Sequence, residues 1–168
     1  KAYVKELREL QDNVPPFDDE LARRIIEKEL GSNSADKTRV VLNQGKPIAS
    51  ASLGQVYRAN LKTEGGENID VAVKVQRPGA LVAISLDIGI IRSFAEPWRK
   101  FKGLNSDLEG IIDEWGKRFI AELDYLAEAR NGQLFREAME SRQDLANVVT
   151  AAPVYTSATT RKVLTTGW

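Results

Sequence analysis

The chain has 168 residues, of which 42% are apolar and 29% are charged, a composition typical of one globular domain. Its 24 basic residues are balanced by 24 acidic residues, so no net charge would attract nucleic acid or an anionic membrane surface. Because the sequence contains neither cysteine nor histidine, it excludes disulfides, zinc–thiolate sites, thiol nucleophiles and histidine-based triads.

The N-terminal part predicts two amphipathic helices. Residues 2–12 have apolar side chains at helical spacing, and the following NVPP ends that helix because a residue before proline is pushed out of the α region. The second helix covers residues 18–31, with two aspartates at its start and Gly31 directly after its last turn.

A β section follows. Residues 39–51 and 53–61 flank a short loop, and the turn-rich segment 62–69 leads into a strand at 71–76. In that strand apolar and polar positions alternate, so we expect one face to carry Val71, Val73 and Val75 and the other to carry Ala72, Lys74 and Gln76.

The rest of the chain is mostly helical. We expect a helix over 80–98 with Pro97 as a break, then one long helix from about Asp107 to Glu140. Its apolar stripe is Leu108, Ile112, Trp115, Phe119, Leu123 and Leu126. Residues 147–168 predict two short strands around a turn at 157–160. Strands grouped apart from helices favour an α+β fold with an antiparallel sheet.

The two ends suggest a fragment of a longer protein. The chain begins with Lys1 rather than Met, and it stops at Trp168 directly after a strand-like run. Its longest apolar stretch, residues 79–91, is interrupted by Asp87 and is shorter than the ~20 residues that span a bilayer.

The loop in PIASASLGQVYRA, residues 47–59, has the small side chains that a phosphate-binding turn needs. Small residues let backbone N–H groups approach phosphate oxygens closely, and Ser50 and Ser52 add hydroxyl groups. Alanine and serine stiffen such a loop, and among its residues only Gly54 keeps access to left-handed conformations. We interpret the segment as a modified nucleotide loop.

Lys74 allows two interpretations. It can be a solvent-facing lysine on a half-buried strand, or it can point into a cleft and contact nucleotide phosphates. The tetrapeptide VAVK is typical of the strand that presents such a lysine in protein kinases. The loop and strand that precede it favour the second interpretation.

Three acidic residues of the predicted long helix are candidate partners. Asp124 and Glu128 are four residues apart and repel each other, so they either form a solvated acidic face or meet a distant cation or metal. Glu122 can pair with Arg118 one turn earlier, or it can be a partly buried carboxylate that awaits a distant lysine.

Five segments together resemble the ABC1 family of atypical kinases, also called the UbiB or ADCK family. They occur in the family's order and span nearly the full length: LQDNVPPF, PIASASLGQVYRA, VAVKVQRPG, ELDYLAEARN and RKVLTTGW. The resemblance implies a protein-kinase-like N-lobe with an antiparallel sheet, an αC-type helix and added family-specific helices. It also implies an N-terminal helical extension over residues 1–36 and a nucleotide-binding lobe over 37–168.

The resemblance further implies a site for ATP or ADP. The implied nucleotide contacts are Ala49, Ser50, Ala51 and Ser52 of an alanine-rich loop, together with Gly54, Val56, Ala72 and Lys74. Ser50 interrupts the family's usual Ala-Ala-Ala-Ser run, which leaves the nucleotide preference open. The lysine is implied to hold the phosphates, and Glu128 is its implied αC-type partner.

The resemblance also implies partners outside the chain. Glu122 and Asp124 match a regulatory Glu-x-Asp motif. In relatives the glutamate of this motif meets the lysine of an upstream Lys-x-Gly-Gln helix. A C-lobe is expected after Trp168, with the catalytic base and most of the Mg²⁺ ligands. We therefore expect no metal site within the chain and no ATP turnover by the chain alone.

Three functions remain open for the intact protein. The first is an atypical kinase or ATPase that supports isoprenoid-quinone or prenyl-lipid metabolism, with membrane lipids or quinone-biosynthesis proteins as partners. The second is a pseudokinase scaffold gated by nucleotide, and the third is a structural α+β interaction domain. The style of DEWGKRF and ELDYLAEARN resembles cyanobacterial and plastid members, including plastoglobule or thylakoid-associated ones, more than mitochondrial ones.

Overall fold

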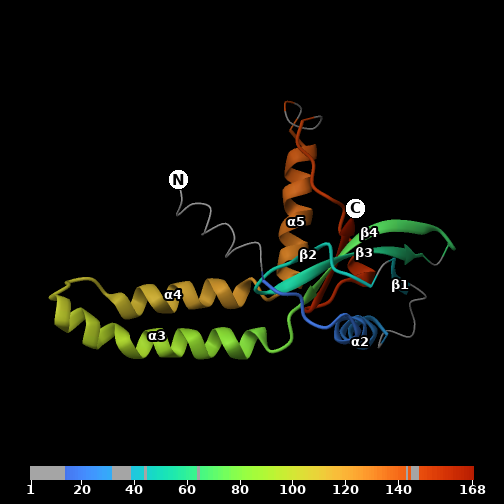
Figure 1. Ribbon diagram of the computed structural model, residues 1–168. Helices are drawn as coiled ribbons and strands as arrows, with labels where there is room; N and C mark the ends of the chain where they lie inside the picture. The colour runs from blue at the N-terminus through green and yellow to red at the C-terminus, as the bar shows by residue number, and fades with distance from the viewer. Residues whose placement is uncertain (1–13, 32–38, 44, 64, 143, 145–147) are drawn as a thin grey trace, which may run out of the picture. The chain divides into compact units, whose positions relative to one another are not determined.

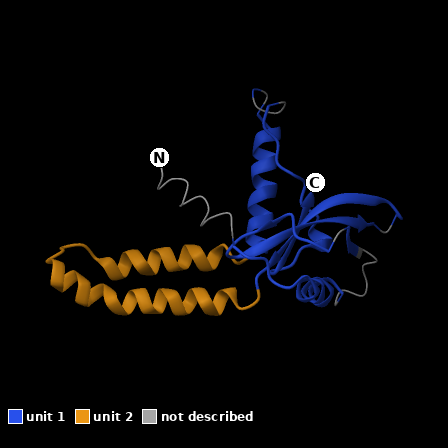
Figure 2. Cartoon of the chain, viewed as in Figure 1, with its two compact units in different colours: residues 1–77, 125–168 blue, residues 78–124 orange. Residues whose placement is uncertain are grey.

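The computed structural model describes residues 14–31, 39–43, 45–63, 65–142, 144 and 148–168. The helix predicted over residues 2–12 lies outside these ranges. The chain divides into two compact units, Lys1–Arg77 with Tyr125–Trp168, and Pro78–Asp124 (Figure 2). Each unit is described by itself.

The first unit is built on an antiparallel sheet, which confirms the predicted α+β class (Figure 1). Its strands are β1 (Arg39–Leu42), β2 (Ala49–Ser50), β3 (Gly54–Lys62), β4 (Asn68–Gln76) and β5 (Val163–Gly167). They lie in the order β1-β3-β4-β5, and β2 pairs with β3 beside this path.

The two predicted closing strands reduce to one. Among the described residues 148–168 only β5 forms; before it lie a 3₁₀ turn, η1 (Thr156–Ala158), and a single bridge between Val154 and Thr166. Pro153 gives a physical reason. Its carbonyl accepts the N–H of Gly167 at 2.8 Å, but proline has no N–H with which to continue the ladder.

The alternation predicted for β4 is confirmed. Val71, Val73 and Val75 are completely buried, whereas Lys74 and its neighbours on the other face are half-buried. Burying a valine side chain stabilises a fold by about 1.5–3 kcal/mol, so the valine face anchors the strand. The core on that face also contains Tyr57, Ala59, Leu61, Ala158 and Val163.

Helix α2 (Asp19–Leu30) covers the same core. The Asp18 carboxylate caps its N-terminus by accepting the N–H of Leu21 at 2.9 Å, and Ala22 and Ile26 pack at i, i+4 spacing into the core. Gly31 ends the helix as predicted, but with right-handed backbone angles.

Tyr57 links this helix to the sheet. Its buried hydroxyl donates to Asp19 Oδ1 at 2.8 Å and accepts from the Gln55 amide. Burial is the main cause that raises the pKa of Tyr57 above its ordinary value, and the hydrogen bond to the Asp19 carboxylate raises it further.

This shift predicts alkaline instability. Because folding raises the pKa of Tyr57, its contribution is fully present below about pH 10 and is lost as the pH rises toward the folded-state pKa. Urea unfolding between pH 8 and pH 11 is expected to show a falling free energy of unfolding, with a shallower fall in Tyr57→Phe. Equal slopes in the two proteins above pH 10 would contradict the assignment.

Helix α5 (Tyr125–Glu140) completes the first unit. It is not continuous with the preceding helix, contrary to the predicted single helix from Asp107 to Glu140. The N–H groups of Leu123 and Asp124 donate to carbonyls three residues back, and this tight turn ends the preceding helix. The end of β4 and the start of α5 bind adjacent residues of the loop before β5. The Gln76 N–H donates to the Lys162 carbonyl, and the Tyr125 N–H donates to the Arg161 carbonyl.

The second unit contains α3 (Ala80–Lys102) and α4 (Leu108–Ala121), which run antiparallel (Figure 1). Ile88 lies against Gly116, where an added Cβ would come within 3.1 Å of its side chain. Arg92 joins the helices through Asp113 at 2.8 Å and Glu109 at 3.8 Å.

The break predicted at Pro97 is wrong, and the apolar stripe is only partly covered. Helix α3 continues through Pro97 and ends only at Gly103, which has a left-handed φ of 62°. Proline costs one hydrogen bond but does not always end a helix. The predicted apolar stripe is not buried throughout, because Trp115 and Phe119 remain 62% and 49% exposed.

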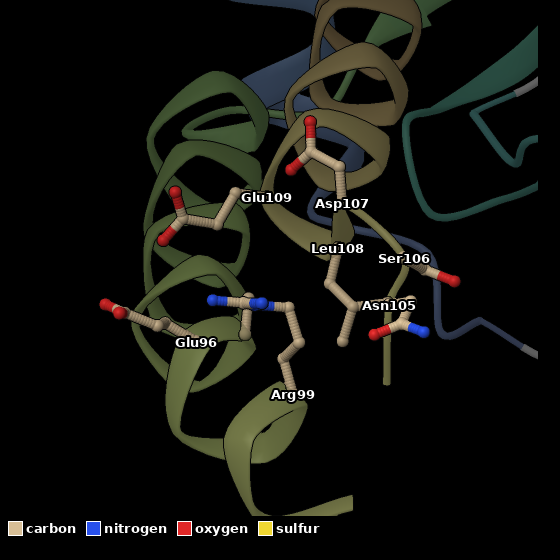
Figure 3. A pocket seen from close by; sticks show the side chains of 8 residues that line it. Glu96, Arg99, Asn105, Ser106, Asp107, Leu108 and Glu109 are labelled. Atoms are coloured by element: carbon tan, nitrogen blue, oxygen red, sulfur yellow. The ribbon is translucent and has the colours of Figure 1, made fainter. Parts of the chain in front are cut away.

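The surface of the second unit is mixed. A hollow of about 380 Å³ has mostly polar and charged walls, among them Glu96, Arg99 and Asp107 (Figure 3). Phe94, Trp98 and Phe101 are exposed on α3. No helix in the described ranges is both long and apolar enough to cross a membrane.

Candidate functional site

Three of the predicted nucleotide-site residues share one face of the sheet. Val56 on β3 pairs directly with Lys74 on β4, and Ala72 lies two residues before Lys74 on the same face. All three are half-buried, opposite the valine face. The hairpin register therefore places two small apolar side chains beside one ammonium group.

Helix α5 brings Glu128 to this face. Tyr125 and Ala129 are buried against Leu164 of β5, and Gly132 approaches Val154 closely enough that an added Cβ would lie 3.7 Å from its side chain. Positions 125, 129 and 132 lie on one side of the helix, and position 128 falls on the same side. Packing of this side of α5 against Leu164 of β5 and against Val154 thus turns Glu128 toward β4.

The predicted ion pair is present. Lys74 Nζ donates to Glu128 Oε2 at 2.7 Å and to Oε1 at 2.9 Å, across 54 residues of sequence. The two side chains are 34% and 45% exposed, and such pairs stabilise folded proteins by only about 0.2–1 kcal/mol. An ammonium group has three N–H donors, so Lys74 keeps one donor for a further acceptor.

Tyr125 lies directly under this pair. Lys74 Nζ is 4.6 Å from the centre of its ring, and its buried hydroxyl has no hydrogen-bond partner within the described part of the chain. Burial first, and the Glu128 charge second, raise the pKa of Tyr125 above its ordinary value. The sequence prediction missed Tyr125, although its i, i+3 spacing to Glu128 indicated that the two share a helix face.

The small-residue loop forms a tight turn between β2 and β3. The N–H of Ala51 donates to the Gly54 carbonyl at 2.8 Å. Ala49, Ala51 and Ser52 are exposed. Within the described ranges, the N–H groups of Ser52 and Leu53 donate to no protein group, so both can meet a ligand.

Gly54 is needed for a different reason from the one predicted. It does not have a left-handed φ. Instead its backbone lies so close to its surroundings that an added Cβ would be 2.5 Å from the Val75 carbonyl oxygen and 2.7 Å from the Tyr125 hydroxyl. The loop base is therefore packed tightly against β4 and α5.

Ser50 points away from the Lys74 face. It pairs in register with Gln55, and its Oγ accepts a hydrogen bond from Arg77 Nη2 at 3.3 Å. Its hydroxyl was predicted to face a phosphate, but this contact directs it toward the base of the loop. Arg77, which follows β4 directly, was not among the residues predicted from the sequence.

Glu122 and Asp124 lie at the end of the second unit. Glu122 is the exposed C-cap of α4, and Arg118 pairs with Glu114 at 3.4 Å rather than with Glu122. Their regulatory role stays a prediction. Among the described residues, no three acidic side chains cluster closely enough to hold a metal ion.

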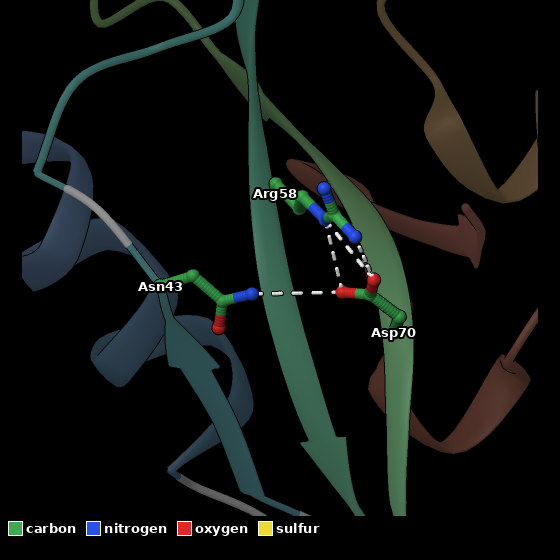
Figure 4. A network of polar contacts seen from close by, with 3 residues as sticks. All are labelled: Asn43, Arg58 and Asp70. Atoms are coloured by element: carbon green, nitrogen blue, oxygen red, sulfur yellow. Dashed lines mark hydrogen bonds and ion pairs between the residues drawn. The ribbon is translucent and has the colours of Figure 1, made fainter.

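A second polar cluster lies on the same face of the hairpin, nearer the β3–β4 turn. Arg58 binds Asp70 through two guanidinium nitrogens, and Asn43 donates to the same carboxylate at 3.5 Å (Figure 4). Hydrogen bonding to Arg58 lowers the pKa of Asp70. The Arg58 guanidinium also lies 4.9 Å from the centre of the Trp168 ring. Arg58 pairs in register with Ala72, so this cluster borders the Lys74 face.

Comparison with known proteins identifies the family. The ABC1 atypical kinase-like domain matches residues 9–168. The chain belongs to the ABC1 family of atypical kinases. The resemblance inferred from the sequence motifs is thereby confirmed.

Relatives of this ABC1 domain occur in chloroplasts and cyanobacteria. An uncharacterised aarF domain-containing protein kinase from Arabidopsis thaliana chloroplasts is 43% identical over 99% of the chain, and the chloroplastic ACTIVITY OF BC1 COMPLEX KINASE 3 is 40% identical over 99%. An uncharacterised Synechocystis protein is 44% identical over 99%. The chain spans 23%, 22% and 23% of their lengths, respectively. These sources agree with the expected plastid or cyanobacterial origin and lend no support to the mitochondrial alternative.

A solved structure supports the kinase-like N-lobe. The Mycobacterium tuberculosis protein Rv3197, determined in complex with erythromycin, superposes with a TM-score of 0.68 and is 28% identical. The match covers 92% of this ABC1 domain and 36% of the Rv3197 chain.

Proposed function

We propose that this ABC1 domain is the ATP-binding lobe of an atypical kinase or ATPase. The observation that carries the proposal is the Lys74–Glu128 ion pair. In protein kinases a strand lysine held by a helix glutamate is the group that contacts nucleotide phosphates. The pair contributes little to stability at this exposure, so its formation between distant segments is better explained by positioning.

The surrounding residues fit a nucleotide. The remaining donor of Lys74 and the N–H groups of Ser52 and Leu53 supply positive partners for phosphate oxygens. The small side chains Val56 and Ala72 leave room for a flat base beside them. Ala49, Ser50, Ala51 and Gly54 shape the loop that covers the nucleotide, and Ser50 acts through its contact with Arg77.

The activity of the whole protein extends this proposal. Phosphoryl transfer needs a base and Mg²⁺ ligands, which we assign mainly to parts of the protein outside this chain. We assign the protein to isoprenoid-quinone or prenyl-lipid metabolism in plastids or cyanobacteria, at plastoglobules or thylakoids in plants, with membrane lipids or quinone-biosynthesis proteins as partners. Glu122 and Asp124 would regulate access to the site.

Nucleotide binding by the full-length protein tests the site. Lys74→Met is expected to weaken the binding of MgATP and MgADP by at least about tenfold, because the phosphates lose their fixed cation. Lys62→Met removes an exposed lysine from β3 of the same sheet and should bind as wild type does. Equal affinities of wild type and Lys74→Met, measured by titration calorimetry, would remove Lys74 from the site.

A second candidate is a pseudokinase scaffold that binds nucleotide without transferring phosphate. The Cβ atoms of Ala49, Ala51 and Ser52 favour it, because they restrict a loop that is usually rich in glycine. ATP consumption that rises on addition of vesicles or a quinone precursor supports the enzyme. Binding without hydrolysis under any of these conditions supports the scaffold. If no nucleotide protects the loop amides against hydrogen exchange, a structural domain remains.

A further inference from the structure

Arg77 occupies an unusual position at the base of the loop. Its backbone N–H donates to the Leu53 carbonyl at 2.8 Å. Its Nη2 lies within hydrogen-bond distance of three acceptors: Ser50 Oγ at 3.3 Å, the Ala51 carbonyl at 3.2 Å and the Pro15 carbonyl at 2.9 Å. One side chain therefore contacts both the loop and a segment more than 60 residues away in sequence.

The same segment is held by a second side chain. Gln55 is 1% exposed; its Oε1 accepts the Phe17 N–H at 3.1 Å, and its Nε2 donates to the Phe17 carbonyl at 3.2 Å. The Arg77 guanidinium also lies 5.5 Å from the centre of the Phe17 ring. Residues 15–17 thus dock onto the loop base through backbone groups that Arg77 and Gln55 recognise.

The chemistry of Arg77 indicates more than packing. Among the described residues its acceptors are carbonyl and hydroxyl oxygens rather than carboxylates, and its buried Nε has no hydrogen-bond partner among them. A buried donor without a partner costs free energy. A guanidinium that served only to hold the loop in place would therefore be an unfavourable choice at this position. The positive charge of Arg77 at the base of the loop favours binding of an anion, such as a phosphate, at the loop. The N–H groups of Ser52 and Leu53, which have no partner among the described residues, could donate to the same anion.

We propose that Arg77 is a positioning residue that couples the nucleotide loop to the docked segment 15–17. The inference rests on the proposed nucleotide site and adds a connection to it. Arg77 fixes the Ala51 carbonyl and the Ser50 hydroxyl on the side away from Lys74. Release of segment 15–17 frees the Arg77 guanidinium and loosens the loop, and a phosphate bound at the loop tightens the segment in return.

Hydrogen exchange in the nucleotide-free, full-length protein tests the coupling directly. Arg77→Lys keeps the charge, but the lysine side chain is one bond shorter, so its ammonium group falls short of the three acceptors that Nη2 contacts. We expect faster exchange in residues 49–54 and at the amides of Val14 and Phe17 together, since Pro15 and Pro16 have no N–H, with the melting temperature nearly unchanged. Arg136→Lys, at an exposed ion pair with Glu140 on α5, is the matched control and should change exchange in neither segment. Faster exchange at the loop alone, or at neither segment, overturns the coupling.

Nucleotide binding tests whether Arg77 also supports the nucleotide site. Arg77→Lys is expected to raise the Kd for MgATP by about tenfold while Arg136→Lys leaves it unchanged. ATP should also slow exchange at the amides of Val14 and Phe17 in wild type and not in Arg77→Lys. If wild type binds ATP but Arg77→Lys binds it equally well, the positioning role is wrong. If wild type binds no ATP, the proposed function itself fails. The coupling through Arg77 is then still tested, because hydrogen exchange in the nucleotide-free protein reports on it separately.

Discussion

Glu128→Gln in the full-length protein is expected to lower ATP turnover about 100-fold while changing the free energy of unfolding by less than about 1 kcal/mol. A neutral amide cannot hold the Lys74 ammonium in the bidentate arrangement seen at 2.7 and 2.9 Å. The lysine then samples other rotamers, and the phosphates lose a pre-positioned partner. Steady-state kinetics and urea unfolding of the same preparation measure the two effects.

The matched control lies on the same helix. Glu140 forms an exposed ion pair with Arg136 at 2.7 Å, so Glu140→Gln removes a comparable pair away from the site and should leave turnover unchanged. The exchanged variant Lys74→Glu/Glu128→Lys can restore an ion pair, but it moves the cation from the sheet to the helix. Recovery of turnover in this variant would show that the pair is structural and that the lysine does not have to lie on β4.

Gly54→Ala is expected to have the second large effect. The added Cβ would lie 2.5 Å from the Val75 carbonyl oxygen, which is backbone and cannot rotate away. Overpacking of this kind lowers the free energy of unfolding by about 1–3 kcal/mol, and here it also pushes the loop away from β4. We therefore expect MgATP affinity to fall together with stability, as measured by calorimetry and thermal unfolding.

The β3–β4 turn offers a control for this substitution. At Gly65 an added Cβ would meet only the Thr63 hydroxyl oxygen, at 3.8 Å, and the φ of this residue is not left-handed. Gly65→Ala should therefore leave both stability and affinity close to wild type. If Gly54→Ala behaves like Gly65→Ala, the close approach at the loop base does not matter for function.

Local pattern was sufficient to predict much of the sheet. The period-2 alternation around Lys74 defines which face is buried, and the structure has that face completely buried. The ion pair with Glu128 was also predicted, because neither neighbour one helical turn away could neutralise that carboxylate and because the motifs resemble a known family. For the buried face the deciding information lay within a few residues, whereas the ion pair also needed the family resemblance.

The errors have different physical causes. The roles of Tyr125 and Arg77 depend on contacts between distant segments, whereas Pro97 removes one hydrogen bond without ending α3. Helical periodicity can run across a short turn, so the stripe ending at Leu126 concealed the break between α4 and α5. Gly54 was expected to need a left-handed backbone conformation. The structure shows instead that there is no space for a side chain at this position.

The hydrogen bonds of Gln76 and Tyr125 to adjacent residues of one loop have a consequence for how such a protein can vary. Residues 76 and 125 both bind the backbone of residues 161–162, so the sheet of the first unit is held together without residues 78–124. These residues are thus an insertion between β4 and α5. Insertions of this kind can change in length or be replaced while the strands of the sheet keep their pairing register. A change of length within residues 78–124 should therefore leave the pairing of the sheet intact.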